Sequence, residues 1–394
     1  MNRIALKADR TFDGERFSGP GVVLVEDGKI AGVAATVPSD WQVQEVPGGT
    51  ILPGLIDAHV HLCADSGPGA LDRLPQTSEG DLAATIEQSL RIHLAAGVTT
   101  VRDLGDHNDA VLSWRARGVA GLPHVVAAGA PITSVGGHCW YLGGEAAGVE
   151  QLEAAVRVRA EAGADVIKIM ASGGAMTPGS DTMSPQFTGD ELRAAVNQAH
   201  DLGLPITAHA HALSAVRQAL EAGVDGIEHC TCLTPDGVRI DADLLDGLAA
   251  AGIAVCATLG SDPSIVVPPE VLEMAAKSGI SQAGLQQTTR RLYDGGVRIV
   301  AGSDGGIAPP KPHGLLPATL AEYVLAGLSE VAALTAATST AAEVLGLRKG
   351  RVRPGYDADL LVVKGDPARD ISALTAVAAV YLAGEAHSGS AELR

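Results

Sequence analysis

A helical stretch that stops at a glycine and continues as a strand is the pattern that recurs along the middle of this 394-residue chain. The stretches before the glycine are rich in Ala and Leu, and those after it are short and β-branched. Glycine favours the left-handed backbone that ends a helix. The pattern is found in AAGVTTV (95–101), EAGADVIKI (161–169), EAGVDGIEH (221–229) and AAGIAVCAT (250–258). Alternating helices and strands of this kind predict a parallel sheet covered by helices.

Eight strands are expected in this middle part, and they favour a (β/α)8 TIM barrel over residues 54–349. A doubly wound open sheet is the alternative, and the count of eight argues against it. The expected strands are 51–61, 99–103, 124–130, 165–170, 205–209, 225–230, 253–258 and 298–304.

Both ends of the chain have a different character, with β-branched runs and turn residues. Asp27-Gly28 lies between two such runs and predicts a hairpin. Residues 350–394 resemble residues 1–53 in this respect. We therefore expect the two ends to build one small β-sandwich domain beside the barrel.

Residues that can bind metals fall at the carboxyl ends of the expected strands, which form the active face of a barrel. The first strand ends with His59 and His61, two residues apart and so on one face together with Asp57. The later strands contribute Lys168, His209, His211, His229 and Asp304. So many imidazoles at one rim predict a metal site rather than a set of core histidines.

Lys168 stands between two isoleucines and should be buried. A buried ammonium tends to lose its proton. The neutral amine can then add carbon dioxide and become a carbamate, whose oxygens can bridge two cations. An ion pair with a carboxylate such as Asp304 is the alternative, and spacing alone does not choose between them.

These motifs resemble the amidohydrolase superfamily, in its imidazolonepropionase-like and Xaa-Pro dipeptidase-like branch. The resemblance covers nearly the whole chain and is carried by 51–61, Gly136-Gly-His138, 168–174, His209-Ala-His211, Ile227-Glu-His229 and 355–360. It implies a binuclear, usually zinc, centre that hydrolyses a C–N bond of a small molecule. His59, His61 and Asp304 would bind the first ion, His209 and His229 the second, and carboxylated Lys168 would bridge them. Asp304 would hold an activated hydroxide and move its proton.

The resemblance also suggests which residues meet the substrate. His138 resembles the residue with which the family contacts its substrate. His211 faces the same way as His209 and could bind the substrate or its oxyanion; for both, the alternative is a histidine that only orients a metal ligand. His313 is a further candidate. Dipeptidase-like relatives have a tyrosine where this chain has Cys232, and Tyr141 could supply an aromatic wall instead. A thiol is a poor replacement for a phenol, which argues against the cleavage of a dipeptide or an acyl-amino acid.

Composition limits the environment and the partners of the protein. The net charge is −18, which disfavours nucleic acid and anionic membranes. The five cysteines include no CxxC pair, and no signal peptide is evident, so we expect a cytoplasmic protein. The family resemblance suggests a homodimer.

Two other functions remain open at this stage. The same metal site could catalyse a cyclising dehydration or the opening of a lactone. The barrel could also have lost catalysis and serve as a metal-binding module, against which the complete ligand set argues.

Overall fold

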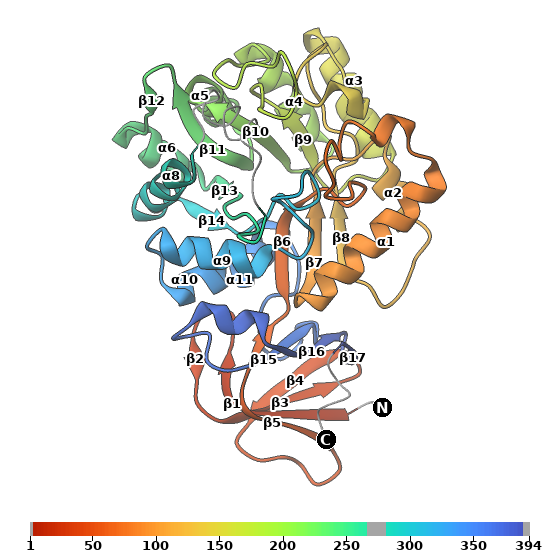
Figure 1. The fold of residues 1–394 in the computed structure, drawn as a ribbon, viewed down its shortest axis with the longest axis vertical. Coiled ribbons are helices and arrows are strands. Elements are labelled where there is room, and N and C mark those ends of the chain that lie inside the picture. Colours follow the sequence, from red (N-terminus) through yellow and green to blue (C-terminus); the bar gives the residue numbers. More distant parts are fainter. Residues whose placement is uncertain (1–2, 266–280, 389–394) are drawn as a thin grey trace.

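The structure is a computed structural model that describes residues 3–265 and 281–388 (Figure 1). An α/β part occupies the upper portion of the view, and a β part built from both ends of the chain lies below it. None of the described helices is both long and apolar enough to cross a membrane.

The β part joins the two ends of the chain in one path of paired strands. The long strand β5 is the link, because it pairs in parallel with β1 and antiparallel with β15. The order is β17-β16-β15-β5-β1-β3-β4, and β2 pairs with β1. The strands are β1 (Arg3–Phe12), β2 (Phe17–Ser18), β3 (Gly21–Glu26), β4 (Lys29–Ala34), β5 (Gln42–Pro53), β15 (Leu360–Lys364), β16 (Val377–Leu382) and β17 (Glu385–Ser388).

The expected hairpin at Asp27-Gly28 is present, since β3 and β4 pair across it and both turn residues have positive φ. Pairing gives one continuous sheet of strands, whereas the sequence predicted a sandwich. The domain limits at residues 53 and 350 stay a prediction.

Strand β15 is buried on both faces, because the β part packs against the α/β part. Leu360 and Val362 belong to the core inside the β part. Leu361 and Val363 belong to the main core of the α/β part. This alternation follows from the two-residue period of a strand. A Cβ placed on Gly97 would lie 2.8 Å from Leu361, so the two parts meet closely here.

The α/β part contains the eight strands expected from the sequence, although most are shorter. Two parallel sheets are paired, β6-β7-β8 and β9-β10-β11-β13-β14, with the short β12 beside β11. The strands are β6 (Leu55–Val60), β7 (Val98–Asp103), β8 (His124–Ala127), β9 (Ile167–Met170), β10 (Ile206–Ala212), β11 (Gly226–Thr234), β12 (Gly237–Val238), β13 (Ala254–Cys256) and β14 (Arg298–Val300).

Backbone hydrogen bonds connect the two sheets at both edges. Ile132 donates to Lys168 and accepts from Met170, both at 2.8 Å. On the other side, Ala58 donates to Ala301 at 2.9 Å and Asp304 donates to His59 at 2.8 Å. These individual hydrogen bonds do not form regular strand pairs, so the two sheets remain separate by strand pairing. A fully closed barrel therefore stays a prediction.

Helices cover the outside of these sheets, and the predicted helix stops are confirmed. Gly97, Gly163, Gly203, Gly223 and Gly252 all have positive φ and lie within two residues of the end of a helix. The helices are α1 (Glu79–Ala95), α2 (Ala110–Arg115), α3 (Gly148–Glu161), α4 (Gly189–Asp201), α5 (Leu213–Ala222), α6 (Ala242–Ala251), α8 (Gln282–Asp294), α9 (Leu316–Leu325), α10 (Glu330–Ala336) and α11 (Ser339–Val344).

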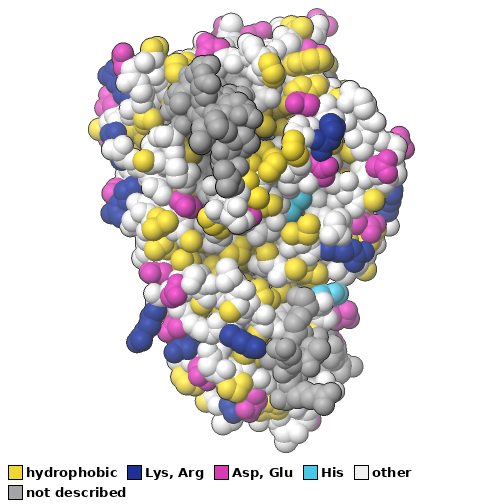
Figure 2. Space-filling model, in the orientation of Figure 1, with side chains coloured by type: hydrophobic (Ala, Val, Ile, Leu, Met, Phe, Trp, Pro, Cys, Tyr) yellow, Lys and Arg dark blue, Asp and Glu magenta, His cyan; other side chains and the backbone are white. Residues whose placement is uncertain are grey.

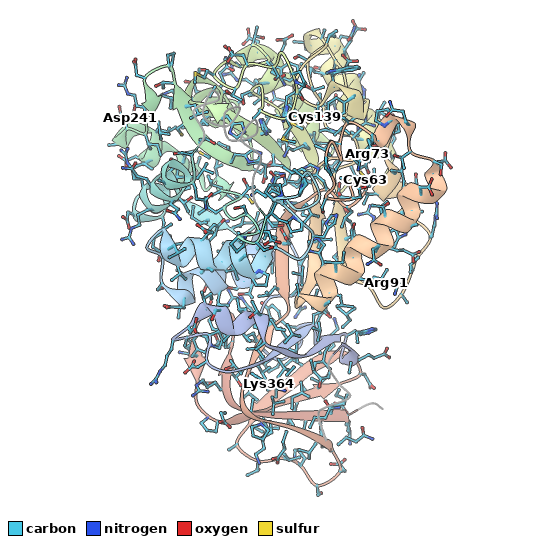
Figure 3. The ribbon with its side chains drawn as sticks, viewed as in Figure 1. Cys63, Arg73, Arg91, Cys139, Asp241 and Lys364 are labelled. Atoms are coloured by element: carbon cyan, nitrogen blue, oxygen red, sulfur yellow. The ribbon has the colours of Figure 1, made fainter. Side chains whose placement is uncertain are left out.

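The surface that Figure 2 shows carries Lys and Arg side chains scattered among Asp and Glu, not gathered in one patch. Figure 3 places Cys63, Arg73 and Cys139 in the upper part and Lys364 in the lower part. All five cysteines are free and buried.

We predict that Leu361→Ala lowers the free energy of unfolding by about 2–5 kcal/mol, because it leaves a cavity where the two parts meet. Val33→Ala is the control, since Val33 on β4 is 52% exposed and should change stability by less than about 0.5 kcal/mol. Urea unfolding measures both. Equal, small effects would show that this contact does not stabilise the fold.

Candidate metal centre

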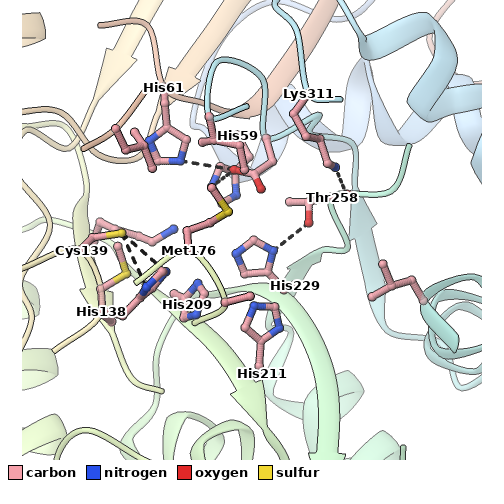
Figure 4. A pocket seen from close by; sticks show the side chains of 17 residues that line it. His59, His61, His138, Cys139, Met176, His209, His211, His229, Thr258 and Lys311 are labelled. Atoms are coloured by element: carbon pink, nitrogen blue, oxygen red, sulfur yellow. Dashed lines mark hydrogen bonds and ion pairs between the residues drawn. The ribbon is translucent and has the colours of Figure 1, made fainter. Parts of the chain in front are cut away.

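One cavity opens at the carboxyl ends of the parallel strands and gathers most of the predicted site residues (Figure 4). It encloses about 810 Å³, with the open space at its mouth included. Its polar wall consists of His59, His61, His138, Lys168, His209, His211, His229, Thr258, Asp304 and Lys311. Leu71, Met170, Met176, Leu285 and Ile307 are among the apolar residues that face them.

The first group of ligand-type side chains is His59, His61 and Asp304, whose ligand atoms lie within 4.8 Å of one another. Asp304 Oδ1 is 3.5 Å from His59 Nε2 and 3.3 Å from His61 Nε2. The other ring nitrogens are already engaged, since Nδ1 of His59 meets Glu228 Oε2 and Nδ1 of His61 meets the Gly105 carbonyl, both at 2.8 Å. Such partners fix the ring orientation and leave both Nε2 atoms facing Asp304.

The second group is His209, His211 and His229, which also lie within 4.8 Å of one another by their ligand atoms. Threonine hydroxyls hold two of these rings, at 2.7 Å from Nδ1 in each case: Thr231 for His211 and Thr258 for His229. His229 also lies beside the first group, with 5.3 Å between its ring centroid and that of His59. The two groups therefore face the same space.

Lys168 is 2% exposed and lines this cavity. Burial lowers the pKa of its amine. The negative charges of Glu228 and Asp304 act to raise that pKa, but the effect of burial is larger. Among residues 3–265 and 281–388 it forms no ion pair, so the predicted alternative of a salt bridge with Asp304 is absent there.

Burial keeps most of the imidazoles neutral, which is the form that binds metal. It lowers the pKa of His59 and His211 to about 4 and that of His138 to about 3. The pKa values of His209 and His229 lie well below the usual range for the same reason, and neighbouring rings add to the effect. For His61, burial acts in the same direction, but the hydrogen bond and charge of Asp304 raise its pKa overall.

A buried carboxylate beneath the site escaped the sequence analysis. Glu228 is 1% exposed and is bonded to His59, to Arg102 Nη2 at 2.9 Å and to Thr207 Oγ1 at 2.6 Å. Burial opposes its ionisation, but the charge of Arg102 and the contact with His59 hold its pKa well below the usual range. Its place in Ile227-Glu-His229 gave a signal, since it directly precedes a predicted ligand.

Asp57 corrects one sequence prediction. It was expected on the same face as His59 and His61, but it does not line the cavity. The pairing of β6 with β7 shifts register between Asp57 and Val60, which breaks the simple alternation. Asp57 instead accepts hydrogen bonds from Ser303 N at 2.9 Å and Ser303 Oγ at 2.6 Å, beside Asp304.

The predicted substrate-contacting residues divide into two sets. His138 and His211 line the cavity, and the ring centroid of His138 is 4.6 Å from that of His209. Cys139 was not predicted but also lines it, with Sγ 3.5 Å from His138 Nε2.

Tyr141, Cys232 and His313 do not line the cavity. Tyr141 lies in a neighbouring surface depression with Trp140 and Asp72. Cys232 is fully buried against Cys230 in a stretch where β11 shifts register. His313 is bonded to Ala64 O at 2.7 Å and to His93 at 3.2 Å, so its ring is held away from the site.

Several residues around the cavity have left-handed backbone, which costs about 1–3 kcal/mol for each non-glycine residue. His229 has φ of 68°, Asp304 of 60° and Thr258 of 48°. Two of these are predicted metal ligands, and strain of this kind concentrates at functional sites.

Comparison with known proteins agrees with this geometry. The model of the amidohydrolase family matches residues 50–386, and the chain belongs to that family. Ochratoxinase of Aspergillus niger is 27% identical over 403 residues, which cover 91% of this chain and 80% of that protein.

Two solved structures share the fold along nearly the whole chain. A Xaa-Pro dipeptidase with bound methionine in its active site has 27% identity and a TM-score of 0.83, covering 98% of this chain and 99% of its own. A prolidase complexed with N-methylphosphonate-L-proline has 26% identity and a TM-score of 0.84, covering 98% and 99%. These neighbours support a TIM-barrel-type α/β fold.

We predict that Glu228→Gln weakens zinc binding about 10- to 100-fold, because the amide cannot hold His59 as the carboxylate does. Glu221→Gln, at an exposed position on α5, is the matched control. Competition with a chelating dye measures both variants. Equal affinities would mean that Glu228 serves only the fold.

We also predict that the metal-stripped protein becomes less stable as the pH falls from the ordinary histidine value of 6.5 towards about 4. The unfolded chain takes up protons in this window, whereas the folded chain keeps His59 and His211 neutral, so acid favours unfolding. Urea unfolding at several pH values measures the slope.

Replacing His211 with Gln should flatten that slope, while His387→Gln, at an exposed position, should leave it unchanged. A stability independent of pH across this window would contradict the assignment of neutral buried histidines.

Proposed function

We propose that the protein is a metal-dependent amidohydrolase that cleaves an amide or other C–N bond of a small molecule. The observation that carries the proposal is the meeting of two groups of ligand-type side chains around one cavity, with Lys168 beside them. Family membership and the hydrolases among its relatives support the same reaction class.

The residues fit two divalent ions, with zinc as our choice. His59, His61 and Asp304 would hold one ion, and His209 and His229 the other. Lys168 would add a further ligand as a carbamate, which its lowered pKa favours, together with the absence of an ion pair within residues 3–265 and 281–388. When bound, such ions polarise a carbonyl and lower the pKa of a water molecule.

The side chains of the protein would then bind and orient the substrate and transfer the protons. Asp304 is the general base: its carboxylate accepts the proton of the attacking water and returns it to the leaving nitrogen. Asp304 is ionised and can accept a proton, because contacts with His61 and His59 hold its pKa below the usual range despite burial. His211 would stabilise the oxyanion, and His138, on the other side of His209, would orient the substrate.

The apolar wall narrows the substrate class. Leu71, Met176, Leu285 and Ile307 offer no charge and no strong hydrogen-bond donor, so they suit a hydrocarbon or aromatic group beside the scissile bond. Ochratoxinase and prolidase are named for particular substrates, and for this chain we propose a peptide-like or cyclic amide that carries such an apolar group.

We predict that exhaustive chelation abolishes turnover and that zinc restores it. Asp304→Asn should lower kcat by at least about 100-fold, because it removes the group that moves the proton. Asp236→Asn, at an exposed position, is the control. Turnover is measured on N-acyl amino acids, dipeptides and cyclic ureides.

Identification of the products separates the competing reactions. A free amine and a carboxylic acid support the proposal, whereas a dehydrated ring or an opened lactone supports the other chemistry at the same site. Full turnover in Asp304→Asn, or after chelation, would contradict the metal-dependent mechanism.

A further inference from the structure

Lys311 is a cationic residue of the cavity that neither the sequence analysis nor the proposed mechanism uses. Its amine donates hydrogen bonds to two backbone carbonyls, Thr258 O at 2.6 Å and Ser303 O at 3.1 Å. Figure 4 shows this side chain reaching across towards Thr258 at the edge of the cavity. The two carbonyls follow different strands, β13 and β14, so one ammonium ties two rim segments together.

Each of these carbonyls belongs to a residue that is bonded to a predicted metal ligand, either along the chain or by a hydrogen bond. Ser303 directly precedes Asp304, and Asp57 already holds its amide and hydroxyl. With Lys311 on its carbonyl, every polar group of this fully buried serine has a partner. On the other side, the Thr258 hydroxyl is 2.7 Å from Nδ1 of His229.

Both contact points also include left-handed backbone. Thr258 itself has φ of 48°, and Asp304, which follows Ser303, has φ of 60°. Such conformations persist only when the surroundings hold them. The hydrogen bond that Lys311 donates to each carbonyl is a suitable restraint, since a buried carbonyl left without a donor is costly.

The turn that carries Lys311 is rigid enough to act as a fixed support. Lys311 N donates to Ala308 O at 2.8 Å, and two prolines fill the positions between them. Proline restricts the backbone and lowers the entropy lost on ordering. Gly306, with φ of 108°, brings the same turn against His61, where a Cβ would lie 2.4 Å from the His61 carbonyl oxygen.

We propose that Lys311 is a positioning residue that couples the two ligand groups, fixing Asp304 through Ser303 and His229 through Thr258. The inference rests on the proposed function and adds a residue that acts on both metal positions without touching either ion. Removing it should loosen both groups together, because both carbonyls would lose the same hydrogen-bond donor.

The test is a titration of Zn2+ alone into the metal-stripped full-length protein, with wild type, Lys311→Met and Lys7→Met compared. Methionine keeps the length of the side chain but offers no donor. Lys7 forms an exposed ion pair with Glu45, so its variant controls for loss of a positive charge. Lys311→Met should weaken Zn2+ binding about 10- to 100-fold, as loss of other residues that orient metal ligands does.

Two further measurements distinguish positioning from other roles. An alkylamine added to Lys311→Ala should restore part of the Zn2+ affinity by occupying the vacated space. Replacing Lys311 should lower kcat by the same factor for substrates with and without a carboxylate. A variant with normal Zn2+ affinity and a raised KM only for carboxylate substrates would overturn the inference, because Lys311 would then contact the substrate.

Circular dichroism checks that each variant folds. Should Lys311→Met fail to fold, Lys311→Arg decides: affinity within about threefold of wild type supports positioning, and a loss beyond about tenfold contradicts it. A wild-type protein that binds no Zn2+ would refute the proposed function and this inference together. Unchanged affinity in Lys311→Met, with normal wild-type binding, refutes the inference alone.

Discussion

Burial keeps a cluster of imidazoles uncharged at the centre of this protein. As cations, His209, His211 and His229 would repel one another across ring distances of 4.6–4.7 Å. Their low pKa values remove that repulsion and leave ring nitrogens with free electron pairs in one cavity. The metal chemistry that we propose depends on this neutral state, and acid acts against both the site and the fold.

The polar network beneath the cavity shows how such a site is kept in place. Glu228 connects His59 to Arg102 and Thr207, so a ligand on β6 is fixed by side chains from β11, β7 and β10. A buried carboxylate with several partners is costly to disturb, because removing one partner leaves a charge without compensation. Together with the chain of contacts from Asp57 through Ser303 to Lys311, it ties the ligands to most of the rim.

The sequence predicted those site residues whose place follows from lying at the carboxyl end of a strand. His59, His61, Lys168, His209, His229 and Asp304 were all expected at one rim, and the structure brings them to one cavity. The meeting of both chain ends in one β part was also expected, because both have the same β-branched character, although the strands pair in one sheet and a sandwich was predicted. The sequence did not predict the orientation of residues at positions where the register of strand pairing shifts.

Asp57 and Cys232 illustrate this limit. Each lies where strand pairing shifts. Counting residues along the strand assigned Asp57 to the wrong face, and Cys232, considered because relatives have a tyrosine there, is buried against Cys230 instead. Lys311 and His313 sit on a loop after β14, where no periodicity indicates direction. The partners of Glu228 come from three other strands, and only their arrangement in space reveals them.

The most direct measurement is a crystal structure of the zinc-loaded protein with anomalous data collected at the zinc edge. The account predicts two anomalous peaks in the cavity, one beside His59, His61 and Asp304 and one beside His209 and His229, with extra density on Lys168 Nζ. An absence of peaks there, or zinc bound elsewhere with these side chains unchanged, would contradict it.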